Sequence, residues 1–386
     1  MQEYGLIALP VGFERFHRQD FINYQLNRAH AFGCISSQSL ERAATDIKAL
    51  DDCPEVLEQH AHQAAEQEDY RAAFYMAKGA EFFTSPADIE LKKRRLEATL
   101  DYFTRGFASY DIERHQLPYE DGWMPVSILR SSTNEKHGVV LFCGGFDSLV
   151  EEFFPIWERI AAAGFDVYAF EGPGQGSART LGQLVFAHDW EKPVGHILDH
   201  YGLSDVTLVG MSMGGYWAVR AAAYEERITR VVSWPPVYDW LEKIPSFLEP
   251  VVHGMAKRRG FMNWSIRLRM KMFPILEHSV RHAVYISGGS EPVDCVGWFL
   301  GMNREHISSE RITQDVLIMA GEADTFQPLS LATAQREALR HASRVQQRVF
   351  TRVESAESHC QMGNIGLAAQ VLCHWLRTGE VLPPDR

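Results

Sequence analysis

The sequence predicts an α/β protein in which a mostly parallel sheet with flanking helices follows a helical N-terminal region. From Phe13 to about Arg114, apolar residues recur every three or four positions and Gly and Pro are sparse, a pattern typical of amphipathic helices. After Gly122, short β-rich runs alternate with glycine loops and helical segments, as in a parallel sheet with crossover helices. A long helical stretch interrupts this alternation after Pro235, and we expect an insertion there.

The composition excludes several classes of protein. Hydrophobic residues make up 46% of the 386 positions and charged residues 23%, an ordinary balance for a folded chain. The formal net charge of −12 disfavours nucleic acid and anionic membranes as partners. Six cysteines without a C-x-x-C pair indicate neither a disulfide framework nor a zinc site. Because the sequence shows no signal peptide and no apolar run long enough to span a bilayer, we expect a cytoplasmic location.

Residues 1–120 are expected to form a helical cap. One helix start is indicated at Ser85, whose hydroxyl can cap the helix, with Pro86 at the first helical position and Asp88 facing the positive helix end. Cys53 and Pro54 indicate a second start in the same way.

Residues 121–386 are expected to form one α/β core. A helical lid is expected over about 236–310. Insertions at such a position cover the carboxyl edge of a parallel sheet and shape a pocket there. The predicted strands lie at residues 124–129, 138–143, 166–170, 206–210, 230–233, 316–320 and 345–350.

A nucleophile is predicted at Ser212. The apolar run 206–210 leads into the G-x-S-x-G motif Gly210-Met211-Ser212-Met213-Gly214, and a helical segment follows. In this context the motif is a nucleophile elbow, which exposes the serine hydroxyl and needs glycines so that strand and helix can approach closely. The backbone amide of Met213 would then stabilise an oxyanion. The alternative is a tight turn without chemistry.

A serine nucleophile needs a base and an acid, which α/β-hydrolases supply later in the chain. Asp324 follows the strand at 316–320, and His359 lies one loop after the last strand. Glu322 is the main rival to Asp324, whereas Asp315 precedes its strand and so lies at the wrong edge of the sheet. The alternative for His359 is an ordinary surface histidine.

A second oxyanion donor is expected from the loop GGFDS at residues 144–148, through the amide of Gly145 or Phe146. An ordinary turn is the alternative. The segment EGPGQG at residues 171–176 looks like a dinucleotide loop but lacks the G-x-G-x-x-G spacing, so we expect a tight turn and no NAD. No metal or organic cofactor is expected.

Two features near the insertion suggest ligands. Aromatic residues that include Trp234, Tyr238 and Trp298 suit a flat substrate, although packing within the lid explains them equally well. A basic run without acidic residues favours an anionic substrate or an acyl carrier protein, the alternative being a solvated helix face. The residues of this basic segment are Lys257, Arg258, Arg259, Arg267, Arg269 and Lys271.

The motifs GGFDS, FEGPGQG, GMSMGG, GEADTFQP and SHCQMGN follow a helical N-terminal region in that order. This arrangement resembles the α/β-hydrolases of the 2,6-dihydroxypseudooxynicotine hydrolase and fungal Ayg1-type polyketide-shortening group, over most of the chain. The resemblance implies an α/β-hydrolase fold with an N-terminal cap and a helical insertion after the sixth strand of that fold. It also implies a homodimer with Ser212 as nucleophile, Asp324 as orienting acid and His359 as base.

The resemblance further implies hydrolysis of a C–C bond beside a ketone. The substrate would be a β-dicarbonyl, polyketide-derived aromatic compound, either free or bound to an acyl carrier protein. The same residues would also suit a carboxylesterase, a thioesterase or a lactone-forming cyclase, and these alternatives stay open. A non-catalytic binding protein similar to FrsA is a further alternative, against which the joint presence of Ser212, Asp324 and His359 argues.

Overall fold

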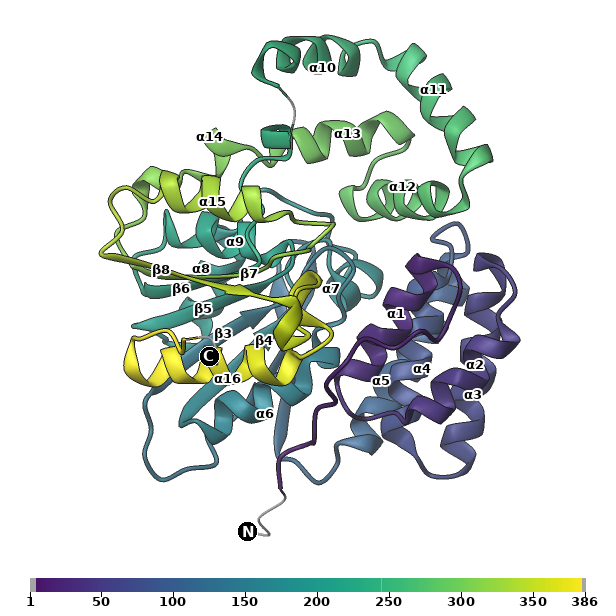
Figure 1. Ribbon diagram of the computed structural model, residues 1–386, viewed down its shortest axis with the longest axis horizontal. Coiled ribbons are helices and arrows are strands. Elements are labelled where there is room, and N and C mark those ends of the chain that lie inside the picture. The colour runs from purple at the N-terminus through teal and green to yellow at the C-terminus, as the bar shows by residue number, and fades with distance from the viewer. Residues whose placement is uncertain (1–4, 244, 384–386) are drawn as a thin grey trace.

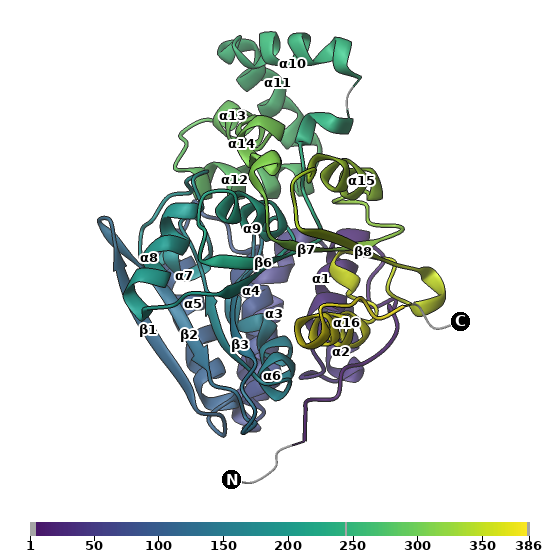
Figure 2. The ribbon, with the colours of Figure 1, turned by 90° about the vertical axis from the view of Figure 1, so that its left-hand side faces the viewer.

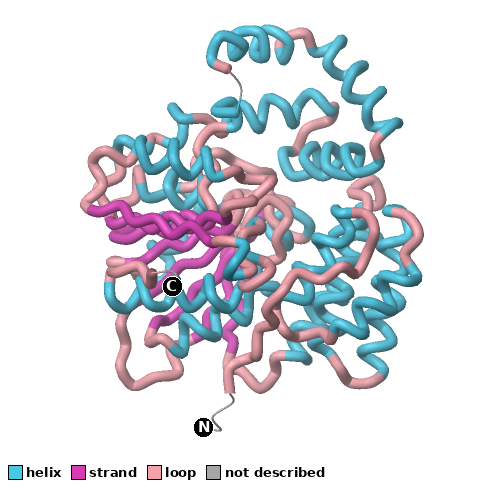
Figure 3. Tube along the Cα trace, in the orientation of Figure 1, coloured by secondary structure: helices cyan, strands magenta, loops and turns pink. Residues whose placement is uncertain are grey.

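An eight-stranded sheet forms the centre of the protein. The computed structural model describes residues 5–243 and 245–383, and Figure 3 shows the strands together, with helices around them. The strand order is β1-β2-β4-β3-β5-β6-β7-β8. The strands are β1 (Ile112–Tyr119), β2 (Gly122–Leu129), β3 (Gly138–Cys143), β4 (Phe165–Phe170), β5 (Val206–Met211), β6 (Ile228–Trp234), β7 (Asp315–Gly321) and β8 (Arg344–Phe350).

The sheet is mixed, because β2 pairs antiparallel with both β1 and β4, while the other neighbours pair parallel. The seven predicted strands correspond to β2 through β8. The sequence analysis missed β1 and extended the helical pattern to about Arg114. An edge strand has only one neighbour, so the exposed polar side chains of β1 and its Pro118 are tolerated and hide the usual alternation.

Helices cover both faces of the sheet. One face packs against α8 and α9, and the other against α6 and α16, as Figure 2 shows from the side. The helices of the core are α6 (Phe154–Ala162), α7 (Gly176–Thr180), α8 (Glu191–Tyr201), α9 (Gly214–Ala222), α15 (Leu329–Ala338) and α16 (Ile365–Thr378).

Within the described residues, five α-helices precede the sheet, and they lie beside it in Figure 1. They are α1 (Asp20–Ala31), α2 (Ser37–Asp46), α3 (Cys53–Glu66), α4 (Tyr70–Phe83) and α5 (Ile89–Gly106). The predicted start at Cys53 is confirmed, but Ser85 does not cap the next helix. Asp88 does so instead, since its carboxylate accepts the amide of Leu91 at 3.0 Å, while Ser85 and Pro86 form the preceding turn.

A helical insertion follows β6, as predicted, and lies above the sheet and the first helices in Figure 1. It comprises α10 (Glu249–Ala256), α11 (Arg259–Met272), α12 (Pro274–Ser287), α13 (Pro292–Gly301) and α14 (Arg304–Ile307). This architecture is the predicted α/β-hydrolase fold. In the described part of the chain, none of the helices has the length and hydrophobicity that a membrane span requires.

Candidate active site

Ser212 lies in a sharp turn between β5 and α9. Its φ angle is +58°, a left-handed conformation that is strained for a residue with a side chain. The neighbouring glycines are required by close contacts: a Cβ at Gly210 would lie 1.9 Å from the carbonyl oxygen of Gly214. A Cβ at Gly145 would lie 2.6 Å from the Cβ of Ser212. The strand, the helix and the loop after β3 therefore meet at this serine.

The structure brings Ser212, His359 and Asp324 together from three separate loops. The Oγ of Ser212 lies 2.9 Å from Nε2 of His359, and Nδ1 of His359 lies 2.7 Å from Oδ2 of Asp324. The other carboxylate oxygen of Asp324 accepts the amides of Phe326 and Gln327, each at 2.8 Å. The carboxylate is thereby fixed, and it can hold His359 with Nδ1 as donor and Nε2 as acceptor.

The rival acids lie elsewhere. Glu322 is exposed and accepts the amide of Arg352 at 2.7 Å, and Asp315 is the first residue of β7, at the opposite edge of the sheet. The surroundings of His359 also tune its basicity. Burial lowers the pKa of His359, but interactions with Cys360 and Asp324 raise it, and the resulting pKa lies well above the ordinary value of 6.5.

In the loop after β3, one of the two predicted oxyanion donors is already hydrogen-bonded. The amide of Gly145 donates to Oγ of Ser148 at 2.8 Å, so this amide is engaged within its own loop. The amides of Phe146 and Met213 stay as the candidate donors. The Nε2 of Gln175 donates to the carbonyl of Gly144 at 2.9 Å and to that of Gly145 at 2.8 Å. The FEGPGQG motif thus forms a tight turn that braces this loop.

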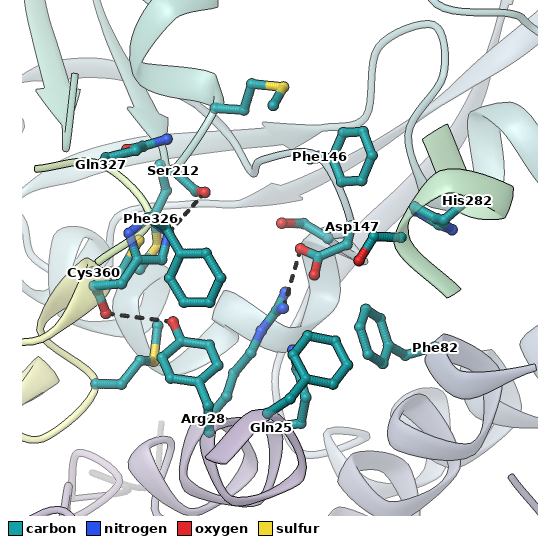
Figure 4. Close-up of a pocket in the computed structure, with 18 of the residues that line it drawn as sticks. Gln25, Arg28, Phe82, Phe146, Asp147, Ser212, His282, Phe326, Gln327 and Cys360 are labelled. Carbon is teal, nitrogen blue, oxygen red and sulfur yellow. Dashed lines mark hydrogen bonds and ion pairs between the residues drawn. The ribbon is translucent and has the colours of Figure 1, made fainter. Parts of the chain in front are cut away.

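Ser212 and His359 open into a cavity of about 360 Å³, a size typical of small-molecule sites. Figure 4 shows the cavity with Ser212 on one side and Phe82, Phe146 and Asp147 around it. Eight aromatic side chains from the described parts of the chain line the wall, so the cavity suits a flat ligand with apolar faces. These aromatic residues are Phe21, Tyr24, Phe82, Phe146, Phe153, Trp240, Phe299 and Phe326.

The three aromatic residues predicted to bind substrate lie outside this wall. Trp234 is fully buried on β6, and its indole N–H donates to Gln361. Trp298 packs behind Phe146, with ring centroids 5.5 Å apart, and Tyr238 is half-buried without lining the cavity. These residues were predicted to bind substrate because they are aromatic and lie near the insertion in the sequence. Neither property distinguishes a side chain that faces the cavity from one that packs inside the protein.

Helix α1 supplies cavity residues that the sequence analysis did not identify, namely Phe21, Tyr24, Gln25 and Arg28. Their spacing of i, i+3, i+4 and i+7 places them on one helix face, and three polar side chains on that stripe were a usable signal. Arg28 forms an ion pair with Asp147 at 3.1 Å and a second with the buried Glu152.

The lid contributes two histidines to the cavity wall, whereas its basic segment lies outside the cavity. Burial lowers the pKa of His278 to about 4 and that of His282 to about 3, so these wall residues are neutral near pH 7. All six residues of the basic segment are exposed and do not line the cavity. Among the residues that the structure describes, no group of three or more His, Cys, Asp or Glu side chains is arranged to hold a metal ion.

The chain is similar to several known proteins. A family model described as "Serine aminopeptidase, S33" matches residues 134–353. The hydrolyase poxO of Penicillium oxalicum is 29% identical over 347 residues, covering 73% of this chain and 82% of that protein. The 20-hydroxy-prefusarin hydrolase FUS2 of Gibberella moniliformis is 27% identical over 253 residues, covering 60% of each chain.

A solved structure extends the likeness to nearly the whole chain. The 2,6-dihydroxy-pseudo-oxynicotine hydrolase superposes with a TM-score of 0.64 at 20% identity, covering 93% of this chain and 98% of the other. At this identity the match establishes the fold, including the helices before the sheet.

Proposed function

Because this chain belongs to the family of α/β-hydrolases whose model matches residues 134–353, we propose that it is a serine-dependent hydrolase that cleaves a C–C bond beside a ketone. The observation that carries the proposal is the hydrogen-bonded series from Ser212 through His359 to Asp324 at the wall of an aromatic cavity. Each member has the geometry that its role requires.

The mechanism follows from these positions. The Nε2 of His359 takes the hydroxyl proton of Ser212 as Oγ attacks a carbonyl carbon of a β-dicarbonyl substrate. The amides of Met213 and Phe146 stabilise the resulting oxyanion. When the intermediate collapses, the C–C bond breaks, and its electron pair passes to the neighbouring ketone as an enolate. His359 returns the proton to that carbon, and water then hydrolyses the acyl group from Ser212.

The cavity supports an aromatic, ketonic substrate, because aromatic side chains contribute a large part of its wall. The relatives of fungal origin are named as a hydrolyase and as a 20-hydroxy-prefusarin hydrolase, which supports a secondary metabolite as the substrate. Delivery on an acyl carrier protein is part of the proposal, since the exposed basic segment can attract an acidic partner.

Product analysis tests the proposal. Wild-type protein is incubated with benzoylacetone and, separately, with phenyl acetate in ¹⁸O-labelled water, and the products are identified by mass spectrometry. C–C hydrolysis releases a methyl ketone together with an acid that contains one labelled oxygen. Turnover of phenyl acetate without cleavage of benzoylacetone or any other aryl β-diketone would identify an esterase instead.

A further inference from the structure

One face of helix α1 forms the cavity wall across from the nucleophile. Figure 4 shows Gln25 and Arg28 extending from this helix into the cavity, on the side away from Ser212. Tyr24 lies on the same face, four residues before Arg28, and also lines the cavity. The proposed mechanism assigns no role to these polar groups, although polar side chains in an aromatic cavity are the groups that orient a ligand.

Tyr24 lies beside His359. Its ring centroid is 6.4 Å from that of His359 and 5.3 Å from that of Phe326. Its hydroxyl oxygen lies 3.5 Å from the carbonyl oxygen of His359, beyond the 2.5–3.0 Å of an ordinary O–H···O hydrogen bond. The hydroxyl of Tyr24 therefore makes at most a weak hydrogen bond to this carbonyl. It can rotate and donate to a better acceptor within the cavity.

C–C hydrolysis creates a need for such a donor. The first oxyanion forms on the attacked carbonyl, beside the amides of Met213 and Phe146. When this intermediate collapses, the negative charge moves to a different oxygen, that of the departing enolate. The amides of Met213 and Phe146 do not stabilise that oxygen. We propose that the hydroxyl of Tyr24 donates a hydrogen bond to the enolate oxygen of the leaving group, which makes Tyr24 a catalytic residue for C–C cleavage. This inference rests on the proposed function.

The charges around Tyr24 support a donor role. Burial raises the pKa of Tyr24 well above 10.0, and Cys360 adds to this effect while Arg28 opposes it, so the phenol keeps its proton at neutral pH. The guanidinium of Arg28 adds positive charge to the same face of α1, although its pairs with Asp147 and Glu152 offset much of that charge.

The step balances without a further reactant. As the oxyanion collapses to the acyl–Ser212 ester, the electrons of the C–C bond move into the enolate, whose oxygen accepts the hydrogen bond from Tyr24. The proton that His359 took from Ser212 then passes to the enolate carbon, which gives the neutral ketone. Tyr24 keeps its own proton throughout and is ready for the next cycle.

The test compares Tyr24→Phe with wild type on two substrates. The variant retains the ring contacts and removes only the hydroxyl. For benzoylacetone we expect kcat to fall about 100-fold, as for the loss of one donor to a developing oxyanion, with KM nearly unchanged. For p-nitrophenyl acetate we expect kcat within about twofold of wild type, since a good leaving group needs little stabilisation. Tyr224→Phe, which removes the hydroxyl of an exposed tyrosine that is hydrogen-bonded to Ser308 at 3.0 Å, serves as the matched control.

The outcomes separate the two claims. Equal losses on both substrates would assign Tyr24 to the positioning of His359 and overturn the inference, as would an unchanged kcat on benzoylacetone. Across a series of β-diketones, kcat should fall more steeply for the variant than for wild type as the leaving enolate becomes more basic. Equal slopes of log kcat against the pKa of the leaving ketone would contradict the proposal. If wild type itself hydrolyses esters but no β-diketone, the proposed C–C activity fails, and the role of Tyr24 fails with it.

Discussion

Arg28 of helix α1 forms an ion pair of 3.1 Å with Asp147 in the loop after β3, which joins the N-terminal helices to the loop beside Ser212. Burial alone would raise the pKa of Asp147, but Arg28 and Lys78 hold it well below its ordinary range. Arg28 also pairs with Glu152, whose side chain is 2% exposed. The cap and the candidate oxyanion loop are therefore electrostatically coupled.

Arg28→Met is expected to lower the free energy of unfolding by about 3 kcal/mol, because it leaves the buried carboxylate of Glu152 and the half-buried carboxylate of Asp147 without their arginine partner. Denaturant titration measures this change. The matched control is Arg15→Met, which breaks the ion pair between Arg15 and Asp20. The two side chains are 64% and 91% exposed, so this variant should lower the free energy of unfolding by less than about 1 kcal/mol. Equal costs for the two variants would contradict a buried coupling.

Asp324→Asn is expected to lower kcat about 10⁴-fold, because the amide favours the wrong tautomer of His359. Glu322→Gln should change kcat by less than about threefold, since this exposed carboxylate only accepts the amide of Arg352. Steady-state kinetics on any accepted substrate measures both. A larger loss in the Glu322 variant than in the Asp324 variant would show that the acid is assigned to the wrong residue.

The pH dependence of kcat/KM should report the raised pKa of His359. The mechanism needs the neutral imidazole, so activity is lost as the pH falls through the pKa of His359 in the free enzyme. Because that pKa lies well above 6.5, the rising limb is expected at a higher pH than for an ordinary histidine. A profile that is already flat from pH 6 upward would contradict this electrostatic description of the site.

Gln175→Ala is expected to lower kcat at least about tenfold while the protein stays folded, because the loop beside Ser212 loses two hydrogen bonds to its carbonyls. Gln314→Ala provides the control. Its amide donates to the carbonyl of Ala222 at 2.9 Å, away from the cavity, and its loss should leave kcat unchanged. Similar kcat values for the two variants would show that the loop does not depend on Gln175.

The sequence predicted those parts of the site that follow from strand position. Ser212, Asp324 and His359 each follow a predicted strand, and the carboxyl ends of parallel strands meet at one edge of a sheet. Such residues can be located without coordinates. The fold was predictable for the same reason, apart from the polar edge strand β1 and the helix capped by Asp88 instead of Ser85.

The remaining site residues depend on side-chain direction, which the sequence does not reveal. The amide of Gly145 could be placed near Ser212, but its bond to Ser148 is a property of the folded loop. Trp298 lies next to the cavity-lining Phe299 in sequence and yet packs away from the cavity. Tyr24 and Arg28 reach the site through the docking of α1, more than 180 residues before Ser212.

Covalent labelling tests the central claim most directly. A fluorophosphonate probe, followed by peptide mass spectrometry, should modify wild-type protein at Ser212 alone, whereas folded Ser212→Ala should neither react nor turn over substrate. Modification of a different residue, or substantial turnover by the Ser212→Ala variant, would contradict the assignment of Ser212 as the nucleophile.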